Sequence, residues 1–376
     1  MKYNNLMSHF NNLIEQKKIR SAGFCIAENG KIVSCAAIGD MDLGNGLRKN
    51  VNTDTIFEIQ SITKWITAAA ILILMERREL SLCDHAARYI EELKQKPFDK
   101  ITIMHLLTHT SGLVPFEGTF PERNLNWREY IDEENVTASW IPAVLKMGIF
   151  HEPGNRWEYS MMGFCILGEI ISRITGEQVE DFIRREILLP CEMMETHWKY
   201  ETTPELSERY LVRTDRHRQQ YKAAQLLGAD AWIDYCAGWK EIPETAGGLM
   251  STLKDIIHFG IMLSQDGSYG NRQILHESSI LLFEYNQLND GVRDFCWNHG
   301  GIRTAYGAGC AAHYSLFDKT MNVGEKTIYH EGTGPCMLMV NRKEKLAAVW
   351  NAPFWTEHEW YAEPIKKTAD IIWNSR

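Results

Sequence analysis

Short apolar runs and amphipathic stretches follow one another along this chain in an order that predicts strands, then helices, then strands again. Residues 22–27 and 32–38 are apolar runs split by the polar stretch 28–31, which indicates two strands joined by a tight turn. Helical patterns dominate from residue 61 to about residue 190. Strand-like runs return late, at residues 302–313, 327–330, 336–341 and 346–351. This order predicts an α+β protein.

Amphipathic helices are expected at both ends of the chain, over residues 1–18 and 359–373. We expect the two groups of strands to form one antiparallel sheet flanked by helices, with the central helices inserted as an all-helical lobe. The 376 residues contain no low-complexity linker, so a single unit is predicted. Its sheet lobe comprises residues 1–60 plus 240–376, and residues 61–239 form a mainly helical lobe. The boundary between the lobes is the expected place for an active site.

The most informative stretch is Ser61-Ile62-Thr63-Lys64, at the start of a predicted helix. Positions i and i+3 lie on one helix face, so the Lys64 amine can reach the Ser61 hydroxyl and accept its proton. If Ser61 opens the helix, unpaired backbone amides and the positive end of the dipole lie where an oxyanion would form. The apolar run at residues 66–75 predicts a helix that is buried on nearly every side.

The same four-residue pattern occurs a second time, as Ser251-Thr252-Leu253-Lys254, so the pattern alone is weak. In this second copy Thr252 and Asp255 resemble a capping box ahead of apolar residues. We therefore interpret the second copy as a helix start without a catalytic role.

Two later segments offer partners for a Ser-Lys nucleophile. Tyr159 lies in a loop before an apolar helix, and a tyrosine beside a lysine can have its phenol pKa lowered and then carry protons to a leaving group. An isolated tyrosine is more commonly a packed aromatic residue. Residues 329–335 lie between two strand-like runs, and their glycines allow a ligand to approach the backbone. Without Ser61, that segment would be an ordinary hairpin turn.

Taken together, these residues resemble the serine β-lactamase and penicillin-binding protein superfamily, in particular its class C β-lactamase-like esterases and peptidases. The similarity extends over most of the chain. Besides Ser61 to Lys64, it is carried by segments in the order and spacing of that family: residues 103–113, Pro153-Gly154, Tyr159-Ser160, Leu167-Gly168, Thr175-Gly176 and residues 246–252. The resemblance implies a β-lactamase/transpeptidase-like fold.

The resemblance also implies roles for individual residues. Ser61 would be the nucleophile, Lys64 the base that activates it, and Tyr159 the general acid/base partner. His330-Glu331-Gly332 corresponds to the third motif of the family, which contributes to substrate binding. The backbone amides of Ser61 and Thr333 would form the oxyanion hole.

Two departures from the family pattern affect the expected substrate. Met161 occupies the position of an asparagine in the second motif, and a thioether has no hydrogen-bond donor to replace the amide. In the third motif His330 replaces the usual lysine, and Glu331 replaces a small hydroxyl residue. A site without a fixed cation and with an added carboxylate should bind a substrate carboxylate less well. Efficient β-lactam hydrolysis is therefore not expected.

Composition excludes several other classes of function. The net charge is −9 without a basic stripe, which disfavours nucleic-acid binding. The longest apolar run is far shorter than the ~20 residues that span a bilayer. Nine scattered cysteines and the absence of an apolar signal segment predict a cytoplasmic protein with free thiols. His105 and His109 have the spacing of helical metal ligands but lack the following acidic residue, and no cofactor fingerprint is present. Neither metal nor cofactor is expected.

The leading hypothesis is a serine hydrolase that cleaves a small-molecule ester or amide through an acyl-enzyme on Ser61. An acyltransferase of the same fold requires the same acyl-enzyme, so the sequence does not separate the two. A non-catalytic ligand-binding relative is the alternative from a different class, motivated by Met161 and Glu331. The natural substrate and the oligomeric state are left open, although aromatic residues in 116–140 and 198–239 favour an apolar or aromatic acyl group.

Overall fold

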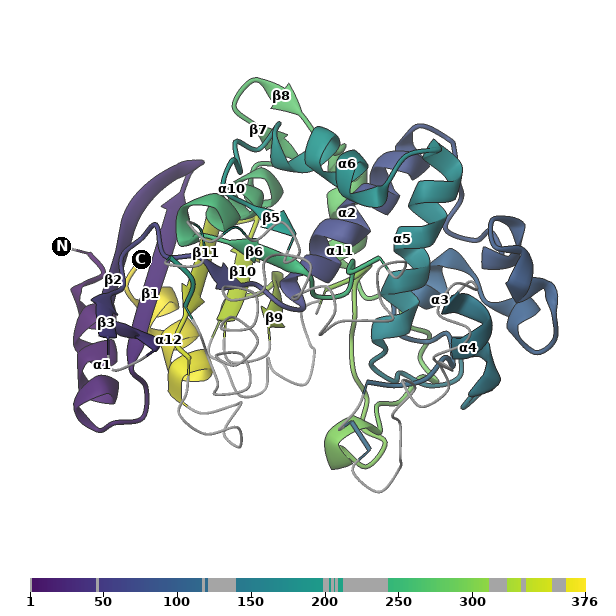
Figure 1. Cartoon of the computed structure of the whole chain (residues 1–376), viewed down its shortest axis with the longest axis horizontal. Coiled ribbons are helices and arrows are strands. Elements are labelled where there is room, and N and C mark those ends of the chain that lie inside the picture. The colour runs from purple at the N-terminus through teal and green to yellow at the C-terminus, as the bar shows by residue number, and fades with distance from the viewer. Residues whose placement is uncertain are drawn as a thin grey trace.

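A six-stranded antiparallel sheet formed by both ends of the chain is the centre of the fold (Figure 1). The computed structural model describes residues 2–44, 47–116, 119–120, 140–198, 203, 206, 209–211, 243–310, 323–332, 336–353 and 363–376. In spatial order the sheet contains β3 (Leu47–Asn50), β2 (Lys31–Gly44), β1 (Ser21–Glu28), β11 (Leu346–Asn351), β10 (Cys336–Asn341) and β9 (Thr327–Gly332). The early and late strand groups therefore share one antiparallel sheet, as the sequence predicts.

The central strands are buried because both faces of the sheet are covered. Side chains of β10 and β11 are buried along their whole length. On one face, α10 (Leu253–Ser264) packs against β1, β10 and β11. On the other face, α1 (Asn4–Glu15) and α12 (Glu363–Asn374) cover a core that contains Trp350 and Met337 (Figure 1).

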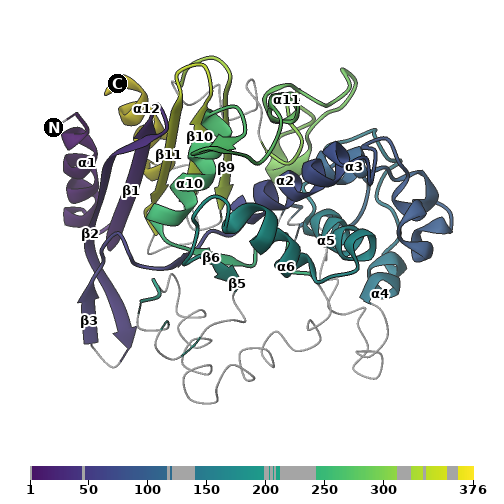
Figure 2. The same cartoon turned by 90° about the horizontal axis from the view of Figure 1, so that it is seen from above.

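The remaining helices lie beside the β9 edge of the sheet, as Figure 2 shows. Helix α2 (Ile62–Glu76) is at their centre and contacts α5 (Met161–Thr175), α6 (Val179–Ile183) and β9. Residues 62–74 of α2 are all buried, which confirms the burial predicted from its apolar run. The other helical elements of this part are α3 (Ile103–Leu107), α4 (Trp140–Lys146), a π-helical turn (Arg184–Leu188) that contacts α2, and α11 (Glu277–Glu284).

Short elements connect these parts. A three-stranded sheet contains β4 (Phe57–Glu58), β6 (Leu249–Ser251) and β5 (His197–Trp198), and β7 (Ser268–Tyr269) pairs with β8 (Arg272–Gln273). Four 3₁₀ turns complete the described elements, at Ala86–Arg88, Glu91–Lys94, Phe98–Lys100 and Cys296–Asn298. One core cluster includes residues of both α2 and the sheet, such as Ile66 and Leu338. The division into lobes at residues 60 and 240 stays a prediction.

The strand predicted over residues 302–313 is wrong for its described part, residues 302–310. There, Ile302 forms a single bridge to Asp294, and the chain is otherwise irregular. Gly309 has a φ of +90°, which a strand does not accommodate. Backbone hydrogen bonds also go elsewhere, since the Ala308 amide donates to the Leu282 carbonyl at the end of α11. Residues 311–313 lie outside the described residues.

None of the described helices has both the length and the apolar character required to cross a bilayer.

Candidate active site

The turn from β4 into α2 positions Ser61 at the start of the helix. Gln60, directly before it, has a φ of +50°, a left-handed conformation that is uncommon for residues with a side chain. Ser61 is the N-cap of α2 and is partly exposed, whereas Lys64 is completely buried one turn later. The Lys64 Nζ atom lies 3.1 Å from the Ser61 Oγ atom. The structure therefore brings together the two residues that the i, i+3 spacing predicts to meet.

The surroundings of Lys64 favour its neutral form. Its Nζ atom lies 4.9 Å from the centroid of the Tyr159 ring and 5.8 Å from that of Phe164. Burial lowers the pKa of Lys64 to about 7 because the ammonium loses its hydration. Near neutral pH, a large fraction of the side chain is therefore an amine with a free lone pair, which can accept the proton of Ser61.

A backbone carbonyl holds the Lys64 amine in place. The Nζ atom donates a hydrogen bond of 2.6 Å to the Ala246 carbonyl oxygen. The residue before Ala246 is itself anchored, since the Thr67 hydroxyl donates to the Thr245 carbonyl at 2.8 Å and the Thr245 hydroxyl donates to the Phe164 carbonyl at 2.8 Å. With one N–H directed at Ala246, the lone pair of a neutral Lys64 is available to Ser61. Sequence reasoning missed this contact because a backbone acceptor has no residue signature.

Tyr159 lies immediately before α5, and the helix cap fixes its place. The Ser160 side chain accepts from the Gly163 amide at 3.4 Å and donates to the Val114 carbonyl at 2.7 Å. Burial raises the pKa of Tyr159 above its ordinary value, and the Ser61 side chain offsets only part of this. The expected lowering of the phenol pKa by Lys64 is therefore wrong, because desolvation is the largest influence on this group and raises its pKa. Tyr159 retains its proton and is a donor.

His109, which the sequence presents only as a rejected metal-ligand candidate, is a part of this site. Its ring centroid lies 4.3 Å from that of Tyr159 and 5.2 Å from that of Tyr306. Its Nδ1 atom accepts a hydrogen bond of 3.1 Å from the Ser160 amide, and burial holds its pKa well below the usual range. Neutral His109 therefore packs against Tyr159 and fixes the backbone beside it.

His105 has a different local partner from His109. Its Nδ1 atom accepts from the Thr102 amide at 3.3 Å in the cap of α3. Among the residues that the structure describes, no group of three or more His, Cys, Asp or Glu side chains is placed to hold a metal ion.

The third motif forms the end of the edge strand β9. The His330 Nδ1 atom lies 2.8 Å from the Glu331 carbonyl oxygen, and its Nε2 atom lies 3.4 Å from the Tyr306 hydroxyl. Donation from Nδ1 to the carbonyl leaves Nε2 to accept from Tyr306. Burial, with a smaller contribution from the charge of Lys64, lowers the pKa of His330 to about 3. His330 is consequently neutral, and this position carries no cation.

Gly332 allows the end of β9 to approach the turn before Ser61. A Cβ atom at this position would lie 2.4 Å from the Ile59 carbonyl oxygen and 2.5 Å from the Cys336 Sγ atom. Both distances are shorter than van der Waals contact, so only glycine fits without a shift of the strand. The next residue, Thr333, lies outside the described residues, and its expected part in an oxyanion hole stays a prediction.

Met161 and Glu331, the two departures from the family pattern, are both partly exposed. Met161 is the first residue of α5 and packs against the main core. Glu331 follows His330 on β9, and burial raises the pKa of its carboxyl group to about 7. Its Oε2 atom is buried and has no hydrogen-bond partner among the described residues.

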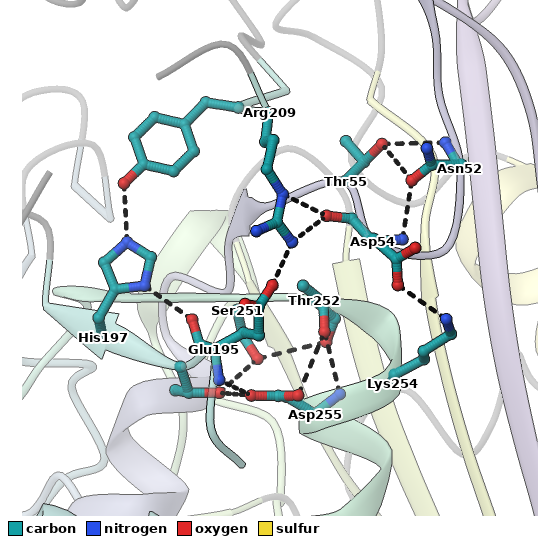
Figure 3. Close-up of polar contacts among 12 residues, drawn as sticks. Asn52, Asp54, Thr55, Glu195, His197, Arg209, Ser251, Thr252, Lys254 and Asp255 are labelled. Atoms are coloured by element: carbon teal, nitrogen blue, oxygen red, sulfur yellow. Dashed lines mark hydrogen bonds and ion pairs between the residues drawn. The ribbon is translucent and has the colours of Figure 1, made fainter. Parts of the chain in front are cut away.

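The second Ser-x-x-Lys copy has different contacts, which Figure 3 shows. The Lys254 Nζ atom bonds to the Asp54 carboxylate at 2.7 Å, away from Ser251. The Thr252 side chain accepts from the Asp255 amide at 3.1 Å and caps α10. The interpretation of this copy as a helix start is therefore confirmed.

Comparison with known proteins gives a consistent result. The family model described as Beta-lactamase matches residues 6–357. Penicillin-binding protein 4* of Bacillus subtilis (strain 168) is 29% identical over 245 residues, which cover 64% of this chain and 51% of that protein. Esterase EstB of Burkholderia gladioli is 28% identical over 199 residues, which cover 49% of this chain and 48% of that protein. The matched region thus spans about half the length of each of these two relatives.

Solved structures show the same fold. The chain superposes on EstCE1, described as a hydrolase with promiscuous acyltransferase activity, with a TM-score of 0.78 and 15% identity, covering 99% of this chain and 98% of the other. A class C β-lactamase from Rhodobacter sphaeroides gives a TM-score of 0.68 and 18% identity, with 98% of both chains covered. At these identities the likeness establishes the fold alone.

Proposed function

The chain belongs to the Beta-lactamase family, and from this premise we propose that it is a serine hydrolase that cleaves a small-molecule ester or amide through an acyl-enzyme on Ser61. The family membership confirms the resemblance that the sequence motifs carry. The observation that supports the proposal most is the 3.1 Å contact between the Ser61 hydroxyl and a Lys64 amine whose pKa is about 7. Such an amine is the kind of base that activates a serine at neutral pH.

In the first step the Ser61 Oγ atom adds to the substrate carbonyl carbon while its proton passes to Lys64. The resulting tetrahedral oxyanion collapses, the bond to the alcohol or amine breaks, and the leaving group takes the proton of the Tyr159 hydroxyl. The Lys64 ammonium then returns a proton to the Tyr159 phenolate, so both groups regain their resting forms. The high pKa of Tyr159 makes its phenolate short-lived beside this donor.

In the second step water adds to the ester carbonyl on Ser61. A proton of the water passes to the Lys64 amine and the bond to Oγ breaks. Ser61 regains a proton either directly from Lys64 or from Tyr159, and in the second case the Lys64 ammonium returns its proton to the Tyr159 phenolate. The products are a carboxylic acid and the free enzyme. An alcohol or amine acceptor in place of water would give acyl transfer, which uses the same groups.

The residues around Ser61 support an ester or amide without a carboxylate near the scissile bond. Met161 offers a thioether where an amide would hold a substrate amide. His330 is buried and neutral, and Glu331 adds a carboxyl group at the same end of β9. A penicillin carboxylate would therefore meet no fixed cation from these residues and would be repelled by an ionised Glu331. We propose that β-lactam hydrolysis is inefficient.

A non-catalytic, ligand-binding role is the alternative from another class. This role would explain why Met161 and Glu331 depart from the family pattern. It gives no reason for a buried lysine beside Ser61. An ammonium without hydration is costly to bury, and a structural role would be filled more easily by an apolar side chain. The contacts of Lys64 with Ser61 and Ala246 therefore favour catalysis.

The test is labelling with an alkyl fluorophosphonate, combined with hydrolysis of p-nitrophenyl butyrate. We expect covalent labelling at Ser61, located by peptide mass spectrometry, and loss of turnover in Ser61→Ala. Ser251→Ala is the matched control, because it removes the serine of the second motif copy and should retain labelling and turnover. Hydrolysis that persists in Ser61→Ala, or labelling at another serine, would refute the mechanism.

A further inference from the structure

Glu331 is the second-last residue of β9, and the proposed mechanism gives it no chemical role. Its neighbour Gly332 packs against the residues that lead into Ser61, including the Ile59 carbonyl, so the end of β9 is adjacent to the nucleophile turn. The negative charge of Glu331 contributes to raising the pKa of both Tyr159 and Tyr306. The carboxylate is thus within electrostatic reach of the proposed proton donor.

The carboxyl group of Glu331 has an unsatisfied oxygen. Its Oε2 atom is buried, and no hydrogen-bond donor among the described residues reaches it. Lys366 of α12 lowers the pKa of Glu331 by charge attraction, but this effect is smaller than the effect of burial. In contrast, the buried carboxylate of Glu284 receives two hydrogen bonds from Arg342, at 3.1 and 3.3 Å. A desolvated carboxylate without such a partner is destabilised until a donor or cation binds to it.

Two aromatic rings lie beside Tyr159, the proposed proton donor. The centroid of the Tyr159 ring lies 5.8 Å from that of Trp297 and 6.4 Å from that of Phe116. Both of these rings are partly exposed. The backbone amide of Trp297 donates a hydrogen bond of 2.8 Å to the Thr119 carbonyl, which positions this residue. The faces of such rings attract cations through their quadrupoles, and they attract anions poorly.

We propose that the substrate carries a positively charged nitrogen on its leaving-group side, and that Glu331 binds this nitrogen. The inference rests on the proposed function. We place the positive charge on the leaving-group side because Glu331 is within electrostatic reach of Tyr159. In the proposed mechanism Tyr159 donates its proton to the departing alcohol or amine. The bond that breaks is still the one between the carbonyl carbon and the leaving group, which departs as a cationic alcohol or amine. Glu331 holds the charge and takes no part in the proton transfer.

Two butyrate esters of nearly equal shape test the proposal. Butyrylcholine carries a trimethylammonium group, and 3,3-dimethylbutyl butyrate has a carbon atom in place of that nitrogen. The readout is the ratio of their kcat/KM values at pH 8, where Glu331 is ionised. For a charge pair about 5 Å apart that remains partly hydrated, we expect wild-type protein to prefer the choline ester by about tenfold or more.

Variants of Glu331 should change this ratio. Glu331→Gln keeps the shape and removes the charge, so the ratio should fall to within about threefold of one. Glu331→Lys should invert the preference, which keeps the test decisive if the glutamine variant is less stable. Because both esters are measured on one preparation, the ratio is independent of the amount of folded protein. Glu325→Gln is the matched control: Glu325 is exposed in the turn before β9, and its loss should leave the ratio unchanged.

The outcomes separate this inference from the proposed function. If wild type hydrolyses both esters equally and Ser61→Ala abolishes both activities, the cation site is wrong and the hydrolase assignment stands. A choline preference that persists in Glu331→Gln and Glu331→Lys would also overturn the role of Glu331. Absence of turnover together with absence of fluorophosphonate labelling at Ser61 would overturn both proposals.

Discussion

The buried amine of Lys64 predicts a specific pH dependence for the acylation of Ser61. Burial lowers the pKa of this completely buried side chain from 10.5 to about 7. The difference corresponds to about 5 kcal/mol by which burial disfavours the ammonium relative to the amine. About half of the molecules therefore carry neutral Lys64 at pH 7, compared with roughly one in 3,000 for a hydrated lysine. The acylation rate should follow this neutral fraction.

We expect the first-turnover rate to rise by about 90-fold between pH 5 and pH 8, with a midpoint near pH 7, and to level off above it. The direction is fixed because only the neutral amine accepts the proton of Ser61. Stopped-flow release of p-nitrophenol from p-nitrophenyl butyrate, followed at its isosbestic wavelength, measures this rate. Lys64→Arg replaces the amine by a permanently charged guanidinium and should be inactive throughout this range.

The other titrating groups are separated by controls. Glu331 also has a pKa of about 7, so the profile is repeated in Glu331→Gln, where the midpoint near pH 7 should persist. The pKa of His330 is about 3, and the pKa of His109 lies well below its usual range. Neither group therefore contributes to the rise of the acylation rate between pH 5 and pH 8. A midpoint at pH 9 or above would show that Lys64 is hydrated during the reaction. A rate independent of pH would show that another group accepts the proton.

Further predictions concern stability and the two motif copies. Burial depresses the folded-state pKa of Lys64, so the free-energy penalty of burying its ammonium is full below pH 7 and falls as pH rises towards 10.5. The stability gain of Lys64→Met in urea unfolding should therefore be smaller by about 3.5 kcal/mol at pH 10 than at pH 7. An equal gain at both pH values would contradict burial of the charge. Gly332→Ala places a Cβ atom 2.4 Å from the Ile59 carbonyl oxygen and should cost about 1–3 kcal/mol in thermal unfolding with slower acylation, whereas unchanged values would argue against close packing here. Lys254→Met removes an exposed ion pair with Asp54, so stability should change by less than about 1 kcal/mol and acylation should be unaffected; lost activity would contradict the cap assignment.

Much of the fold could be predicted because burial leaves a direct pattern in the sequence. The strands at residues 336–341 and 346–351 coincide with β10 and β11, since strands covered on both faces read as continuous apolar runs. Helix α2 was likewise predictable from an apolar run with strong helix formers. The strand prediction for residues 302–310 is wrong because tertiary contacts decide their conformation. Their backbone groups form hydrogen bonds to α11 and to one another, and Gly309 permits a turn that a strand excludes.

The candidate site divides in the same way. The Ser61 and Lys64 contact is local, so the helical spacing is sufficient to predict it. The Ala246 carbonyl comes from 182 residues further along the chain and leaves no side-chain signal. The spacing of His109 to His105 suggested only a metal-ligand pattern, while its packing against Tyr159 depends on the loop that ends at Ser160. The unpaired oxygen of Glu331 could not be predicted either. It results from the absence of a hydrogen-bond donor nearby among the described residues, and such an absence has no sequence pattern.

Burial also explains why the predicted direction of the pKa shift of Tyr159 is wrong. Reasoning from neighbours considers the attraction of Lys64, but desolvation acts on both groups and drives each towards its neutral form. The same effect keeps His330 neutral and leaves Glu331 only partly ionised near pH 7. The proposed transfer of the Ser61 proton to Lys64 would therefore create charge in poorly hydrated surroundings, where fixed donors and opposite charges act strongly. A cationic leaving group bound at Glu331 would favour the ionised carboxylate, and this links substrate binding to the charge state of the site.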